Sequence, residues 1–193
     1  MIQVIGLVLI AIFSENMVLA RCLGMDWPKR TDMTEDRAWH IGVSITLVMV
    51  VTALLSWLIN VLVLRFFGIE HLRILAYTLM VLAAVALVRQ VLRLFFPVLY
   101  RHLNEDLSQT VYNCAVLGVA FIITLRNYSL AQTLLYALAS GIGLLGVLVI
   151  FTGMQDQASF DNCPKVFRGL PIQLLTAGLM ALALMGFYGL NVA

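Results

Sequence analysis

Charged residues are scarce along this chain. Lysine, arginine, aspartate and glutamate together make up 11% of its 193 residues, whereas hydrophobic residues make up 62%. A water-soluble domain of this length needs a polar surface that this composition cannot supply. The mean hydropathy of +0.99 therefore predicts an all-α polytopic membrane protein, because a helix satisfies its own backbone hydrogen bonds in lipid.

Close cysteine pairs and nucleotide-binding motifs are also missing. The three cysteines, Cys22, Cys114 and Cys163, lie far apart in the sequence, which argues against a disulfide scaffold. There is no phosphate loop, dinucleotide fingerprint, serine elbow or HExxH motif, and no basic run typical of nucleic-acid binding. The chemistry of this chain must therefore be sought within its apolar segments.

Six long apolar segments are present, at residues 2–25, 38–64, 72–96, 107–125, 130–151 and 170–190. The first has no basic residue ahead of it and no small-residue cleavage site after it, so we expect a retained span rather than a signal peptide. In the fifth, the pairs Ala137/Gly141 and Ala139/Gly143 would allow another helix to approach closely. Residues 152–169 are predicted to form a polar loop before the last span.

The basic residues predict the orientation of the six spans. Nine of the twelve lie at or near the first, third and fifth connections: Arg21, Lys29, Arg30, Arg37, Arg89, Arg93, Arg101, Lys165 and Arg168. The other three, Arg65, Arg73 and Arg126, lie at the second and fourth connections. By the positive-inside rule, the odd connections are cytoplasmic and both termini face outward.

The two halves of the chain, residues 1–101 and 102–193, each contain three spans and must therefore have opposite topologies. Their first spans also resemble each other, since Asn16-Met17-Val18-Leu19 has an echo in the stretch from Asn113 to Leu117. Ser14-Glu15-Asn16 interrupts the first span, and polar residues fill the front of the fourth. Interrupted helices at matching places in inverted repeats predict a binding site near the middle of the membrane.

Six residues are candidates for this site: Glu15, Asn16, Cys22, Asp26, Asn113 and Cys114. Ionisable and polar groups are costly at membrane depth, so Glu15, Asn16 and Asn113 are candidates for an ion pathway. Plainer interpretations stay open at this point, with Cys114 as a small packing residue and Glu15 as the partner of an arginine. The histidines His40, His71 and His102 fall at span ends and are interpreted as interfacial residues.

Three stretches of the second half resemble the membrane subunits of the Rnf and Nqr complexes, most of all the RnfA subunit of the Rnf complex and the related NqrE subunit of the sodium-pumping NADH:quinone oxidoreductase. They are Asn113 to Ala120, Phe167 to Ile172, and Leu174 to Ala183 followed by Met185-Gly186-Phe187. Supporting pieces are Asn16 to Gly24, Arg73 to Tyr77, and Pro97 to Arg101. The resemblance covers nearly the whole chain in the same order.

This resemblance implies two inverted three-helix repeats whose half-helices meet in mid-membrane. It also implies a homologous sister subunit of opposite topology and a shared 2Fe–2S-type iron–sulfur cluster, with Cys114 as the ligand from the second repeat. The cluster would pass electrons between flavin- and iron–sulfur-bearing subunits while Na⁺ or H⁺ is exported across a bacterial or archaeal cytoplasmic membrane. The chain would then be a subunit of a redox-driven translocase rather than an enzyme alone.

The first repeat departs from the family pattern Leu-Gly-x-Cys-Pro. Here Asp26 stands at the cysteine position and Cys22 lies four residues earlier, about 6 Å along a helix axis. Cys22 and Asp26 are therefore the two candidates for the first-repeat ligand. Two other functions stay open: a secondary transporter with Glu15 in a cation-binding cavity, and a non-redox scaffold that keeps the fold.

Overall fold

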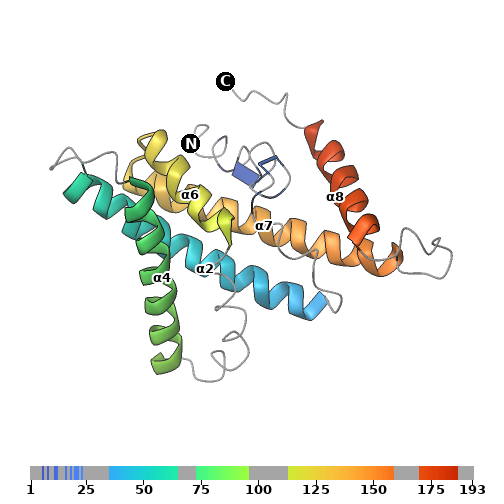
Figure 1. Ribbon diagram of the computed structural model, residues 1–193, viewed down its shortest axis with the longest axis horizontal. Helices are drawn as coiled ribbons and strands as arrows, with labels where there is room; N and C mark the ends of the chain where they lie inside the picture. Colours follow the sequence, from blue (N-terminus) through green and yellow to red (C-terminus); the bar gives the residue numbers. More distant parts are fainter. Residues whose placement is uncertain are drawn as a thin grey trace.

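A computed structural model describes residues 6, 8, 11, 12, 16, 18, 20, 21, 23, 35–64, 73–95, 113–158 and 170–186. These residues form a helical structure composed of α2 (Glu35–Ile59), the π-helical turn η3 (Asn60–Leu64), α4 (Arg73–Phe95), α6 (Cys114–Leu125), α7 (Leu130–Ala158) and α8 (Leu170–Met185). Figure 1 shows α2 and α7 along the length of the molecule, with α6 and α4 against them at one end and α8 at the other. The all-helical prediction is confirmed for these residues.

Three of the described helices are long and apolar enough to cross a bilayer. They cover Arg37–Leu62, Arg73–Leu94 and Leu130–Met154. Two shorter apolar helices cover Cys114–Leu125 and Pro171–Met185. With 12 residues, α6 is about 18 Å long, well short of the roughly 30 Å of hydrocarbon in a bilayer.

The predicted second and third spans agree with the structure to within three residues at each end, but two other boundaries differ. The predicted loop at 152–169 is wrong in its first part, because α7 continues through Ala158. The helix in the fourth segment begins only at Cys114, because Asn113 has an extended backbone. Most of the first segment lies outside the described residues, so the six-span topology stays a prediction.

The main contact in the fold is between α2 and α7, which pack in antiparallel directions. Gly42 lies opposite Leu145, and Thr46 lies opposite Gly141, four residues further along α2 and four residues back along α7. A Cβ atom added to Gly141 would come within 2.5 Å of the Thr46 Cγ2 atom. The prediction of a close approach at Gly141 is therefore confirmed.

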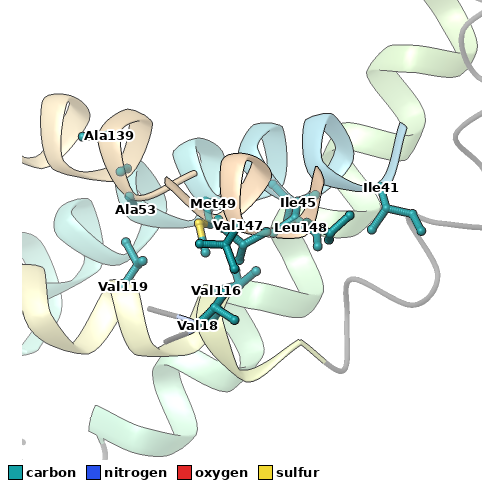
Figure 2. Packing of buried hydrophobic residues seen from close by; sticks show 14 of the residues in the cluster. Val18, Ile41, Ile45, Met49, Ala53, Val116, Val119, Ala139, Val147 and Leu148 are labelled. Carbon is teal, nitrogen blue, oxygen red and sulfur yellow. The ribbon is translucent and has the colours of Figure 1, made fainter. Parts of the chain in front are cut away.

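The buried core lies mainly between α2, α6 and α7 and also includes residues of the first segment, of α4 and of α8. Figure 2 shows Met49 and Ile45 beside Val147 and Leu148, with Val116 next to Val18. Besides their buried residues, α4 and α8 also expose rows of large apolar side chains: Ile74, Leu75, Leu79, Leu82, Leu87, Val91 and Leu94 on α4, and Leu174, Leu175, Leu179, Leu182 and Met185 on α8. Apolar surface of this extent suits contact with lipid or with another membrane subunit.

The close contact at Gly141 gives a prediction with a control on the same helix. Gly141→Ala should destabilise the protein by about 1–3 kcal/mol, because the added methyl overlaps the stiff, β-branched side chain of Thr46. Gly146→Ala is the control, since a Cβ there meets no atom within 4 Å. Thermal unfolding in detergent should show a lower melting temperature for the Gly141 variant alone, and equal melting temperatures would contradict the prediction.

Candidate functional site

Asn113 fixes the point at which α6 begins. Its backbone is extended, with φ −77° and ψ 108°, and its side-chain Oδ1 accepts a hydrogen bond of 2.9 Å from the Ala115 amide. Its own carbonyl accepts a 3.2 Å bond from the Val116 amide. This is the geometry of an asparagine N-cap, which supplies an acceptor for a backbone N–H that the helix leaves open.

Asn16 makes the same side-chain contact in the first segment, whereas its carbonyl bonds one residue further along than that of Asn113 does. Its Oδ1 atom accepts a 3.0 Å bond from the Val18 amide, two residues ahead, and its carbonyl accepts a 3.0 Å bond from the Ala20 amide. Asn16 is 2% exposed and Asn113 is 6% exposed. The similarity between the two stretches therefore extends from the sequence to the hydrogen bond that each asparagine Oδ1 atom accepts.

Asn16 also connects its segment to α7. Its Nδ2 group donates to the carbonyl of Ile12 at 3.0 Å and to the carbonyl of Gly143 at 3.2 Å. A Cβ atom at Gly143 would lie 3.3 Å from that nitrogen and 3.2 Å from the Ile12 backbone. Gly143, expected only to permit helix packing, therefore also provides a hydrogen-bond acceptor for the site.

The two asparagine-capped stretches both contribute to the core. Val18 and Val116, which follow Asn16 and Asn113, are 1% and 0% exposed and belong to one buried cluster. Both are labelled in Figure 2 among the residues of this cluster. Residues close behind Asn16 and Asn113 therefore belong to the same buried cluster, and the arrangement of the two halves as inverted repeats stays a prediction.

Cys114 is the first residue of α6, and its side chain is exposed. It follows directly after the buried Asn113, so a buried and an exposed residue are adjacent at the start of α6. Cys114 is in no disulfide within the part of the chain that the structure describes. Exposure argues against the interpretation of Cys114 as a packing residue of this chain's own core.

Comparison with known proteins adds an independent observation. The family described as "Rnf-Nqr subunit, membrane protein" matches residues 4–191. The chain belongs to this family. The resemblance stated from the sequence is therefore confirmed, and the apolar helices together with the family place this Rnf-Nqr subunit in a membrane as a multi-pass protein.

Individual relatives of this Rnf-Nqr chain carry informative names. It is 38% identical to the A-type subunit of the "Ion-translocating oxidoreductase complex" of Syntrophotalea carbinolica, over 93% of each chain. It is 35% identical to the protein of the same name in Azoarcus sp. strain BH72, over 91% of each chain. It is 33% identical to the A-type subunit of the "Na(+)-translocating ferredoxin:NAD(+) oxidoreductase complex" of Acetobacterium woodii, over 94% of each chain.

The other predicted site residues of this Rnf-Nqr subunit have different outcomes. Glu15, Cys22 and Asp26 lie outside the described residues, as do Cys163, His71 and His102. His40 is exposed near the start of α2. Within the described ranges, no three His, Cys, Asp or Glu side chains gather in a group that could hold a metal ion, so a metal group at Cys114 would take its further ligands from elsewhere.

Proposed function

We propose that this chain is a membrane subunit of an ion-translocating electron transport complex of the Rnf type. The observation that supports this most strongly is the coverage of the relatives, since each of those named above is matched over more than nine-tenths of its length. All three are named as the A-type subunit of an ion-translocating complex. The chain would act together with flavin- and iron–sulfur-bearing subunits, which exchange electrons through it while Na⁺ or H⁺ is exported.

Within that complex, Cys114 provides one thiolate ligand to a 2Fe–2S-type cluster shared with a homologous subunit of opposite topology. Its position fits a shared group, because the thiol is exposed at the N-terminus of α6 rather than enclosed by this chain. A helix N-terminus also favours negatively charged groups. When bound, such a cluster supplies a one-electron relay, and Cys22 or Asp26 would provide the ligand from the first repeat.

The two asparagines would hold this site in place. Asn113 sets the first residue of α6 and with it the position of Cys114. Asn16 sets the matching stretch and joins it to α7 through the Gly143 carbonyl. The equivalent bonds to their Oδ1 atoms support two inverted repeats, residues 1–101 and 102–193, whose interrupted first spans would meet at the site.

The proposed function is tested by removing the subunit and restoring it. Inverted membrane vesicles from a strain without this chain should lose ion uptake driven by ferredoxin or NADH, and expression of the intact chain should restore it. Uptake is followed with radiolabelled Na⁺ and with a pH-sensitive dye. Normal redox-driven uptake without the chain would contradict the proposal, and ion transport by the isolated chain in proteoliposomes would favour a secondary transporter instead.

A further inference from the structure

Hydroxyl side chains in these helices mostly bond to their own backbone. Six of them donate to the carbonyl four residues earlier: Ser44 to His40, Thr46 to Gly42, Thr78 to Ile74, Thr124 to Ala120, Thr152 to Leu148 and Thr176 to Ile172, at 2.7–3.0 Å. This bond satisfies a hydroxyl in an apolar environment without any other partner.

Five polar side chains on α2, η3 and α7 do not follow this rule. The hydroxyl oxygens of Thr52, Ser56, Thr133 and Ser140 and the Oδ1 atom of Asn60 have no hydrogen-bond partner within the described part of the chain. The four hydroxyl residues are 0–1% exposed and Asn60 is 5% exposed. A buried polar group left unsatisfied costs about 1–3 kcal/mol, so five together indicate that something else satisfies them.

By helix spacing the five groups lie in two rows, one along α2 and η3 and one along α7. We call the two rows together the polar row. On one side, Thr52, Ser56 and Asn60 follow each other at four-residue steps along the chain, which places them on one face and spans about 12 Å. On the other side, Thr133 and Ser140 are seven residues apart on one face of α7. Gly42 faces Leu145 and Thr46 faces Gly141, so each step of four residues forward on α2 matches a step of four residues back on α7. Two further steps place Thr133 at the level of Leu54, between Thr52 and Ser56.

A cavity lies beside Asn60, at one end of the polar row. Asn60, which begins the π-helical turn η3, lines a cavity of about 230 Å³ together with Trp57, Thr124, Asn127, Tyr128 and Ser129. This volume has room for several water molecules. Single π-helical turns within α-helices are frequent at functional sites.

The walls of this cavity are held by specific bonds. Trp57 Nε1 donates to the Tyr128 carbonyl at 3.1 Å, and the hydroxyls of Tyr77 and Thr124 lie 2.7 Å apart. The turn after α6 is closed by Asn127 at φ 51°, with bonds from the Asn127 amide to the Thr124 carbonyl and from the Tyr128 amide to the Ile123 carbonyl. These are the bonds of a Schellman motif, which fixes the positions of Asn127 and Tyr128 in the lining of the cavity.

We propose that the polar row is a hydrated path through which a small monovalent cation moves between this cavity and the interior of the subunit. The inference rests on the proposed function, because it assigns to the chain a part of the ion route. Hydroxyl and amide oxygens are suitable ligands for a hard cation that has lost part of its water. The row contains no carboxylate, so a cation would pass without being held by a fixed negative charge. The same oxygens suit Na⁺ and a proton carried on water, and the experiment distinguishes them.

The transport test uses the complete complex in inverted vesicles. The double variant Thr52→Val/Ser56→Ala removes two hydroxyls with little change in volume. Uptake of the translocated ion per electron should fall at least about fivefold, as expected when two hydrogen-bonding contacts are lost. Radiolabelled Na⁺ and a pH-sensitive dye show which ion is affected. Thr152→Val is the matched control, because this buried hydroxyl is already bonded to Leu148, and it should leave uptake unchanged.

A labelling test detects the water directly and does not depend on transport. In the intact complex, Ser56→Cys should react with a small cationic methanethiosulfonate at least about tenfold faster than Thr152→Cys, which is equally buried. Peptide mass spectrometry assigns each modification and separates it from the native cysteines. Equally slow labelling at both positions, or unchanged uptake in the double variant, would overturn the inference. Failure of the proposed function would instead appear as absent redox-driven uptake in the parent complex, while the labelling difference would persist.

Discussion

Replacing Cys114 with serine in the assembled complex is expected to remove the paramagnetic signal of the reduced cluster. Electron transfer through the complex should fall at least about tenfold, since even the loss of a residue that only supports a metal ligand costs about 10–100-fold. A serine hydroxyl stays protonated near neutral pH and is a poor substitute for the soft thiolate that iron–sulfur clusters require. The measurements are electron paramagnetic resonance, iron content and the rate of ferredoxin- or NADH-driven electron transfer.

The same variant should leave the subunit folded and assembled. Cys114 is exposed, and the bonds that begin α6 come from Asn113 rather than from the cysteine. Cys163→Ser makes the identical chemical change elsewhere in the chain and should retain both signal and activity. A full signal with normal electron transfer after Cys114→Ser would show that the chain is a scaffold that keeps the fold without the redox chemistry.

Hydrophobicity predicted where helices lie better than where they end. For α4 the predicted and observed ends differ by one residue, because the apolar segment and the helix coincide. α7 extends through Ala158, seven residues beyond the predicted span, because apolar content marks the bilayer whereas a helix continues until something breaks it. The start of α6 at Cys114 depends on the extended backbone of Asn113, and hydropathy does not report a backbone dihedral angle.

The candidate site was predictable where it depends on local sequence and unpredictable where it depends on side-chain orientation. In both stretches an asparagine is followed by apolar residues, and this pattern pointed to Asn16 and Asn113 as corresponding positions. In the structure each Oδ1 atom accepts a hydrogen bond from the amide two residues ahead. The bond from Asn16 to Gly143 joins residues 127 positions apart and leaves no local signal. Thr52, Ser56 and Asn60 are visible as a four-residue repeat, but only the structure reveals that the Thr52 and Ser56 hydroxyls have no hydrogen-bond partner within the described part of the chain.

The two asparagines have similar local bonds but different roles beyond them. At Asn113 the side chain acts as a helix cap, because its Oδ1 atom accepts a hydrogen bond from the Ala115 amide. At Asn16 the Nδ2 group additionally donates to two carbonyls, one of them on α7. Replacing the side-chain amide with a carboxylate keeps an acceptor oxygen, removes the donating nitrogen and adds a negative charge. It therefore separates the role of the cap from that of the donor.

Aspartate makes that change without altering the shape of the side chain. Asn16→Asp would place a buried carboxylate oxygen against the carbonyls of Ile12 and Gly143, and an uncompensated buried charge costs about 3–5 kcal/mol. Asn113→Asp also buries a carboxylate, but it does so at a helix N-terminus, where the Ala115 amide and the helix dipole favour a negative charge, so its cost should stay below about 1 kcal/mol. Thermal unfolding of the complex in detergent should show a drop of at least about 6 °C for the Asn16 variant alone. Equal drops for both variants would mean that the link from Asn16 to α7 contributes nothing beyond the local cap.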